Sequence, residues 1–216
     1  MRIVFDLDGT LIDSAADIHV AANAVLAEFG FAPLTFAQVK SFIGRGVPHL
    51  VHRLLAASEA DPKGPLHAQV MAAFVARYED AVTMTVVYPG VPAALASLAA
   101  RGAQLGICTN KPLAPALAVL RHVGLADLFD VVLGGDSLPE RKPDPKPLLE
   151  TFARLGSGPM AYVGDSEVDA ETAARGAVPF ALFTEGYRKA PVAELPHDAA
   201  FDDYAALPRL IDTIAR

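Results

Sequence analysis

The sequence has little cysteine, no long apolar run and no excess of basic residues. Cys108 is the single cysteine among 216 residues, so no disulfide can form within the chain, which fits a reducing compartment. No apolar run approaches the about 20 residues that a transmembrane helix needs. The first apolar strand is expected by about residue 2, so we expect no signal peptide. These absences predict a cytoplasmic protein with no membrane partner.

The charge balance is acidic. Eighteen Lys and Arg residues stand against 25 Asp and Glu residues, which gives a net charge of −7 at pH 7. This balance argues against a general nucleic-acid-binding protein, because such a protein needs a basic face. A phosphate site in this chain would need local positive charge from a metal ion, a few Lys or Arg side chains, or helix amino termini.

Two patterns follow each other along the chain. Apolar residues make up 52% of the sequence, which predicts a packed core. Between residues 15 and 85 they recur at helix spacing, so this segment is predicted to be all-helical. After Tyr88-Pro89-Gly90, short apolar strands alternate with helices. The strands expected there cover residues 105–108, 131–133, 160–163 and 180–183, with a short one near 200–201. The helices expected between and after them cover about 91–101, 112–123, from 145, 167–175 and from 204.

Alternating strands and helices predict a parallel sheet with right-handed crossovers, the Rossmann-like α/β class. The helical segment interrupts this pattern after the first strand. We therefore predict a core of residues 1–14 and 86–216, and an inserted helical cap of residues 15–85. The cap is expected above the carboxyl end of the first strand, where a mobile lid can exclude water and hold a substrate.

The first strand runs into two carboxylates, Asp6 and Asp8, followed by Gly9 and Thr10. Strand side chains alternate, so the two carboxylates should leave the strand end on roughly the same side. The carboxyl end of a strand is where open α/β sheets bind their ligands. Gly9 allows a tight backbone course just past the pair. The alternative is an ordinary acidic turn, since Asp and Gly are common turn residues.

Three later segments bring polar groups to the same end of the sheet. One strand ends in Thr109-Asn110, another ends at Asp165 with Asp169 one helical turn beyond, and Lys142 precedes a helix. In a parallel sheet the carboxyl ends of the strands face one crevice, so these groups are expected to converge on Asp6 and Asp8. Each has an ordinary alternative: the acids can start a helix, the lysine can be a solvated loop residue, and the threonine can simply end a strand.

The charges in such a crevice predict its chemistry. Several carboxylates in one place repel one another unless a cation joins them. Hard oxygen ligands beside a phosphate select Mg²⁺. One carboxylate can attack phosphorus to form an aspartyl-phosphate, and a second carboxyl group can protonate the leaving oxygen and later activate water.

The chain resembles the haloacid-dehalogenase superfamily of phosphohydrolases, whose first motif is D-x-D-G-T-[LV]-x-D-[ST]. The resemblance implies the haloacid-dehalogenase fold and assigns roles to the residues that match its motifs. Asp6 is expected to be the nucleophile and Asp8 the general acid and base. Thr109 matches the residue that holds a phosphate oxygen, with the backbone N–H of Asn110 beside it, and Lys142 matches the lysine of the third motif.

The same resemblance implies a magnesium site. Its expected ligands are Asp6, the carbonyl group of Asp8, and Asp165 of the fourth motif. Asp169 is expected to hold the water molecules of the metal ion, and Thr10 to brace the loop after the first strand. The one cofactor expected is therefore Mg²⁺.

Several segments further resemble phosphoglycolate phosphatases. They are Asp13-Ser14, Phe42-Ile43-Gly44-Arg45-Gly46, Tyr88-Pro89-Gly90-Val91, Cys108-Thr109-Asn110-Lys111-Pro112 and Lys142-Pro143-Asp144-Pro145. Arg45 beside Gly46 is expected to bind a small anionic group of the substrate, and the planar fork of an arginine suits a carboxylate. The alternative is a surface arginine in a turn between helices. Glu167-Val168 and Asp144 depart from the usual pattern of these relatives but lie outside the catalytic set.

The sequence thus predicts a Mg²⁺-dependent phosphatase for a small phosphorylated metabolite, most simply 2-phosphoglycolate. The alternatives are a pyrophosphatase, a sugar-phosphate phosphatase or a β-phosphoglucomutase-like enzyme, and less readily a non-catalytic binding module. We expect a monomer or a homodimer. Two minor expectations complete the list: Cys108 is a small core residue, and the loop that contains Tyr187, Arg188 and Lys189 is solvated.

Overall fold

The computed structural model describes all residues, 1–216, and its centre is a six-stranded parallel sheet. The strand order is β5-β4-β1-β6-β7-β8. The strands are β1 (Arg2–Phe5), β4 (Gln104–Cys108), β5 (Val131–Leu133), β6 (Met160–Gly164), β7 (Phe180–Phe183) and β8 (Ala199–Phe201). The α/β class predicted from the sequence is confirmed. Because Phe5 of β1 is level with Ile107 of β4 and Val163 of β6, these three strands end side by side.

Helices cover both faces of this sheet, because its strands are apolar on both sides. Ile3 and Phe5 point to one face, which packs against α5 (Val91–Ala100), α6 (Leu113–His122) and α9 (Leu207–Ile214). Val4 and Cys108 point to the other face, which packs against α7 (Lys146–Arg154) and α8 (Glu167–Gly176). Burial on both faces is what a parallel sheet requires. The prediction that Cys108 is a core residue is confirmed.

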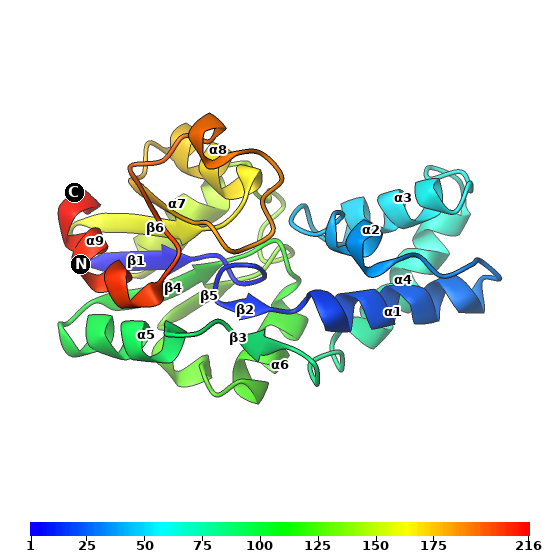
Figure 1. The fold of residues 1–216 in the computed structure, drawn as a ribbon, viewed down its shortest axis with the longest axis horizontal. Helices are drawn as coiled ribbons and strands as arrows, with labels where there is room; N and C mark the ends of the chain where they lie inside the picture. Colours follow the sequence, from blue (N-terminus) through cyan, green and yellow to red (C-terminus); the bar gives the residue numbers. More distant parts are fainter.

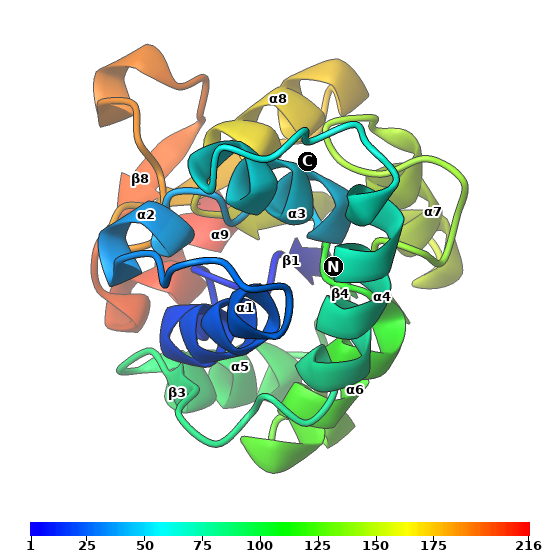
Figure 2. The same cartoon turned by 90° about the vertical axis from the view of Figure 1, so that its right-hand side faces the viewer.

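Four helices between the first strand and the rest of the sheet form a third apolar cluster. They are α1 (Ala15–Glu28), α2 (Phe36–Lys40), α3 (Val47–Ala57) and α4 (Leu66–Tyr78). Leu26, Leu54 and Phe74 are among the fifteen residues of this cluster, which is separate from the two clusters on the sheet. Figure 1 shows the four helices together beyond the ends of the strands, and Figure 2 shows them in front of β1. The exact domain boundaries, 14/15 and 85/86, remain a prediction.

A short ribbon that no pattern in the sequence predicts joins the two ends of this helical insertion. β2 (Ile12–Asp13) and β3 (Val86–Val87) pair antiparallel. Beside the ribbon, Asp17 accepts hydrogen bonds from the backbone N–H of Met84 and the hydroxyl group of Thr85. Two-residue strands are too short to show alternation in the sequence, so only the tertiary structure reveals this junction.

The remaining elements agree with the sequence within a few residues. The helix expected from Tyr204 begins as a 3₁₀ turn (Tyr204–Ala206) and continues as α9, and two further 3₁₀ turns cover Ala126–Leu128 and Val192–Glu194. None of the helices combines the length and the apolar character that a membrane crossing requires.

Candidate active site

Asp6 lies directly after β1, at the centre of the sheet edge. Its backbone N–H donates to the carbonyl group of Val163 at 2.9 Å, and its side chain is 10% exposed. The ammonium group of Lys142 lies 2.9 Å from Asp6 Oδ1. Lys142 also donates to Tyr162 and Asp169, and it is the one polar partner of the buried Asp6 Oδ1. A carboxylate oxygen with one such partner keeps a lone pair for a further ligand.

Lys142 is buried against the sheet, so the alternative of a solvated loop lysine is wrong. Its ammonium group donates to Asp169 Oδ1 at 2.7 Å and to the Tyr162 hydroxyl group at 2.9 Å. Burial by itself lowers the pKa of a lysine, but the negative charges of Asp169 and Asp6 outweigh it and raise the pKa of Lys142. Lys142 therefore carries a permanent positive charge beside Asp6.

Three carboxylates gather around this point. Asp6, Asp165 and Asp169 are all buried, and each offers one oxygen within 4.8 Å of the others. Asp165 follows β6; its Oδ1 accepts from the Thr10 hydroxyl group at 2.7 Å, and its Oδ2 accepts from the backbone N–H of Tyr187 at 2.6 Å. The loop after the first strand and a loop far along the chain thus fix Asp165.

The pKa values of the three carboxylates diverge. Burial, partly opposed by the Lys142 charge, raises the pKa of Asp6 to about 7. Burial followed by repulsion from Asp169 and Asp6 raises the pKa of Asp165 well above its usual value. Burial also acts to raise the pKa of Asp169, but the charge and hydrogen bond of Lys142 and the hydrogen bond from Ser166 lower it. Asp169 is therefore the most readily ionised of the three, and a further cation would favour the ionised forms of Asp6 and Asp165.

This donor set fits Mg²⁺. The carboxylates of Asp6 and Asp165 supply the hard oxygen ligands that this ion prefers, and they come from two neighbouring strand ends. Both oxygens of Asp169 already accept hydrogen bonds: Oδ1 from Lys142 and Tyr162, and Oδ2 from Ser166. The role of Asp169 in holding the water molecules of the metal remains a prediction.

Thr109 and Asn110 follow β4, on the other side of Asp6. The hydroxyl oxygen of Thr109 accepts from the backbone N–H of Lys111 at 3.2 Å, which leaves the hydroxyl hydrogen available to a ligand. The side-chain amide of Asn110 donates at 3.0 Å both to the carbonyl group of Gly44 and to that of Lys142. Asn110 thus links the helical insertion to the loop that carries Lys142, a role that the sequence did not predict.

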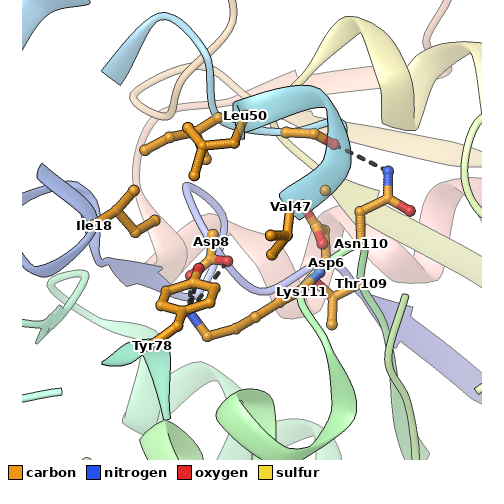
Figure 3. Close-up of a pocket in the computed structure, with 12 residues that line it drawn as sticks. Asp6, Asp8, Ile18, Val47, Leu50, Tyr78, Thr109, Asn110 and Lys111 are labelled. Atoms are coloured by element: carbon orange, nitrogen blue, oxygen red, sulfur yellow. Dashed lines mark hydrogen bonds and ion pairs between the residues drawn. The ribbon is translucent and has the colours of Figure 1, made fainter. Parts of the chain in front are cut away.

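The side chain of Asp8 points to a different set of partners. The hydroxyl group of Ser14 donates to Asp8 Oδ1, and the ammonium group of Lys111 lies 3.2 Å from the same oxygen. Lys111 also donates to the hydroxyl group of Tyr78, the last residue of α4, at 2.7 Å. Figure 3 shows Asp6 and Asp8 in one narrow cavity, with Lys111 and Tyr78 beside Asp8. The sequence shows that Lys111 follows Asn110, but it does not predict the contacts of Lys111 with Asp8 and Tyr78.

Gly46 lies so close to the core that a side chain there would be crowded. It precedes α3 with a φ of 82°, and a Cβ atom there would lie 3.2 Å from the carbonyl oxygen of Asn110. Most residues avoid this backbone conformation, and glycine adopts it freely. Gly46 therefore lets the insertion sit on the strand ends, where it lines the narrow cavity with Ile18, Val47 and Leu50.

Arg45 is exposed and lines a second, wider cavity of about 310 Å³ that also reaches Asp6 and Asp8. His49 and Lys189 line the same cavity. Burial lowers the pKa of His49, and the nearby charge of Arg45 lowers it further. None of these three side chains forms an ion pair with a carboxylate within 4.0 Å. The carboxylates of Asp165 and Glu167 line this cavity too, so Arg45 and Lys189 are the basic groups there that suit an anion.

The expectation of a solvated loop after β7 is wrong for Tyr187. Its side chain is buried, and its hydroxyl group donates to Asp13 at 2.6 Å and accepts from the backbone N–H groups of Ser14 and Ala15. Its backbone N–H binds Asp165. Tyr187 therefore joins the start of the insertion to the predicted metal site, through contacts between segments more than 170 residues apart that no local pattern reveals.

The chain is similar to known proteins over most of its length. Residues 3–183 match the haloacid dehalogenase-like hydrolase family. Among similar curated proteins, a phosphoglycolate phosphatase of Cereibacter sphaeroides is 53% identical over 97% of this chain and 96% of its own. A phosphoglycolate phosphatase of Rhodobacter capsulatus is 50% identical over the same shares. Among solved structures, a predicted phosphoglycolate phosphatase from Haemophilus somnus 129pt superposes with a TM-score of 0.90 at 30% identity, covering 97% of this chain and 96% of that one.

Proposed function

Because the chain belongs to the haloacid dehalogenase-like hydrolase family, we propose that it is a Mg²⁺-dependent phosphatase that hydrolyses 2-phosphoglycolate through an aspartyl-phosphate on Asp6. The observation that carries the proposal is the environment of Asp6. One of its oxygens is buried and has a single polar partner, the Lys142 ammonium group at 2.9 Å, and the Asp165 carboxylate lies in the same cluster. This is the environment of an attacking carboxylate beside a cation site.

In the first step, an oxygen of Asp6 attacks phosphorus and the bond from phosphorus to the ester oxygen breaks. Asp8, protonated at that point, gives its proton to the leaving oxygen, so glycolate departs as an alcohol. Thr109 and Lys142 bind the oxygens of the transferring group and offset their negative charge. Mg²⁺ held by Asp6, the Asp8 carbonyl group and Asp165 would supply further positive charge there.

In the second step, Asp8 takes a proton from a water molecule whose oxygen attacks the phosphorus of the aspartyl-phosphate. The bond from phosphorus to Asp6 breaks, phosphate leaves, and Asp8 has regained the proton that it gave away. The helical insertion restricts the access of water to this chemistry, because Val47 and Leu50 line the narrow cavity that contains Asp6.

The two cavities support a small substrate with a second anion. The narrow cavity takes the phosphate group beside Thr109, and its apolar wall leaves little room for a sugar. The wider cavity carries the basic groups of Arg45 and Lys189, which suit the carboxylate of phosphoglycolate. The names of the relatives point to the same substrate. We further propose that the protein works in the cytoplasm on this metabolite; its state as a monomer or homodimer remains a prediction.

The test is a panel of phosphate esters assayed with Mg²⁺ and again with a chelator. The panel holds 2-phosphoglycolate, pyrophosphate, two sugar phosphates and p-nitrophenyl phosphate. We expect the highest kcat/KM for 2-phosphoglycolate and no turnover with the chelator. Asp6→Asn should abolish turnover of every ester while its circular dichroism and melting curve match those of the wild type. Equal kcat/KM across the panel would remove the substrate assignment, and an active Asp6→Asn variant would remove the nucleophile.

A further inference from the structure

Lys111 is buried between the core and the helical insertion. Its side chain is 2% exposed, and its ammonium group lies 3.2 Å from Asp8 and 2.7 Å from the Tyr78 hydroxyl group. The same ammonium group lies 4.0 Å from the centre of the Tyr78 ring. A buried ammonium group is stable only when its partners compensate for the lost water. Here one partner comes from the loop after β1 and the other from α4, so Lys111 is fully satisfied only while the two parts stay together.

The backbone around Lys111 is held in place from the core side. Its carbonyl group accepts from the N–H of Gly135 at 2.8 Å. The preceding residue, Asn110, binds the carbonyl groups of Gly44 in the insertion and Lys142 in the core. Two consecutive residues after β4 therefore contact the insertion at two separate points. Because the backbone of Lys111 is fixed to the core, its ammonium group keeps the hydrogen bond to Tyr78 only while α4 stays against the core.

Tyr78 acts as a neutral partner. Burial first, and then the nearby Asp8 and Asp17 carboxylates, hold its pKa well above the usual value for a phenol, so the hydroxyl group stays protonated. Asp8 in turn receives a hydrogen bond from Ser14, at the entry to α1, on the same oxygen that faces Lys111. The Asp8 carboxylate is thus oriented by Ser14 and by Lys111. The position of the Lys111 ammonium group depends in turn on Tyr78 at the end of α4.

We propose that Lys111 is a positioning residue: it holds the carboxylate of Asp8 in its working orientation and, through Tyr78, makes that orientation depend on a seated helical insertion. This inference rests on the proposed function of Asp8 as general acid and base. Lys111 keeps its own protons throughout, and the proton that reaches the leaving oxygen comes from Asp8. When α4 moves away, the ammonium group loses one partner and Asp8 loses its fixed orientation, so leaving-group protonation requires the closed state.

The kinetic test compares two leaving groups. Glycolate needs a proton from Asp8 to depart, whereas p-nitrophenolate is stable enough to leave without one. Since kcat/KM reports the steps up to the departure of the leaving group, Lys111→Met should lower it about 100-fold for 2-phosphoglycolate and less than about 10-fold for p-nitrophenyl phosphate. Lys111→Arg should recover part of the lost kcat/KM because it keeps the charge. Tyr78→Phe should also lower kcat/KM more for 2-phosphoglycolate than for p-nitrophenyl phosphate, but by a smaller factor than Lys111→Met.

The matched control is Lys146→Met, which removes a lysine that is 58% exposed and paired with Glu140. It should leave kcat/KM unchanged for both esters. A purely structural role of Lys111 would lower kcat/KM equally for the two esters in Lys111→Met, and that result would overturn the proposal. The proposal would also be overturned if the ratio of kcat/KM for 2-phosphoglycolate to kcat/KM for p-nitrophenyl phosphate were unchanged in both Lys111→Met and Tyr78→Phe.

A second measurement does not depend on turnover. Hydrogen exchange followed by mass spectrometry on the peptide that contains residues 70–78 should be at least about threefold faster in Lys111→Met than in the wild type, and unchanged in Lys146→Met. A wild-type protein that hydrolyses neither ester would contradict the proposed function. Unchanged exchange in Lys111→Met would by itself overturn the link between Lys111 and the insertion.

Discussion

Thr10 and Asp165 are 155 positions apart in the sequence, yet the Thr10 hydroxyl group donates to Asp165 Oδ1 at 2.7 Å. The contact exists because β1 and β6 are paired in parallel and end level with each other. It means that the loop after Asp6 and the acid after β6 form one unit. The predicted magnesium site is therefore built at a junction of two strands, and substitutions there should affect the metal and the fold together.

Lys142→Met should damage both activity and stability. The substitution leaves the buried Asp169 carboxylate without its cation, and the loss of one partner of such a buried pair lowers the free energy of unfolding by about 3–5 kcal/mol. Turnover should also fall by about 100-fold or more, because the charge beside the transferring phosphate is lost. The measurements are urea unfolding and steady-state kinetics. Lys146→Met is the control, and its free energy of unfolding should stay within about 0.5 kcal/mol of the wild type. Equal stability of the two variants would contradict the buried pair.

Gly46→Ala should weaken substrate binding, and Gly102→Ala is its matched control. Both glycines have a positive φ, 82° and 78°, so both variants strain the backbone, and the strain is larger at Gly46, whose ψ of 171° is adopted almost only by glycine. Only at Gly46 would the new Cβ meet another group, the Asn110 carbonyl oxygen at 3.2 Å; around Gly102 the space is open. We expect a raised KM for Gly46→Ala alone. Parallel assays of the two variants check this, and an equal KM would show that the close approach is not required.

Arg45→Ala should raise KM for 2-phosphoglycolate by about 10-fold or more, and leave KM for p-nitrophenyl phosphate nearly unchanged. The reason is that Arg45 lines the wider cavity with His49 and Lys189, away from the phosphate group beside Thr109. The loss of a hydrogen-bonded charge pair with a carboxylate corresponds to about 1.5–3 kcal/mol. Steady-state kinetics with both esters measure it. Equal changes for the two esters would mean that Arg45 does not bind a second anion.

Cys108 should not react with iodoacetamide in the native protein at pH 8. Burial raises the pKa of its thiol to about 12, so the reactive thiolate is scarce at pH 8 and the sulfur is also out of reach. In guanidinium chloride the same residue should be alkylated completely, which serves as the control. Intact-mass spectrometry counts the added groups. Rapid labelling of the folded protein would contradict the burial of Cys108, the last residue of β4, against α7.

Much of this fold is visible in the sequence because it depends on local patterns. The helical spacing between residues 15 and 85 and the alternation of strands and helices after Tyr88 come from which side each segment buries. Asp6, Thr109 and Asp165 each follow an apolar strand, so the parallel sheet brings them to one edge. The placement of Lys142 beside Asp6 followed from its match to a motif; its role and those of the other site residues remain predictions.

Other features depend on contacts between segments that carry no periodic signal. Tyr187 appeared to belong to a solvated loop, but it binds Asp165 and the start of α1. Lys111 adjoined a phosphate-binding pattern, but its ammonium group lies between Asp8 and Tyr78, a residue that looked like part of an ordinary apolar helix face.

Sequence alone determined the class of the fold, the helical insertion and the polar residues at the strand ends. The side that each segment buries sets the spacing of its apolar residues, and the polar motifs directly follow the apolar strands. Only the tertiary structure decided which side chain meets which across the junction of insertion and core. A buried charge takes whatever partner the packing brings within about 3 Å, and that partner can come from any part of the chain.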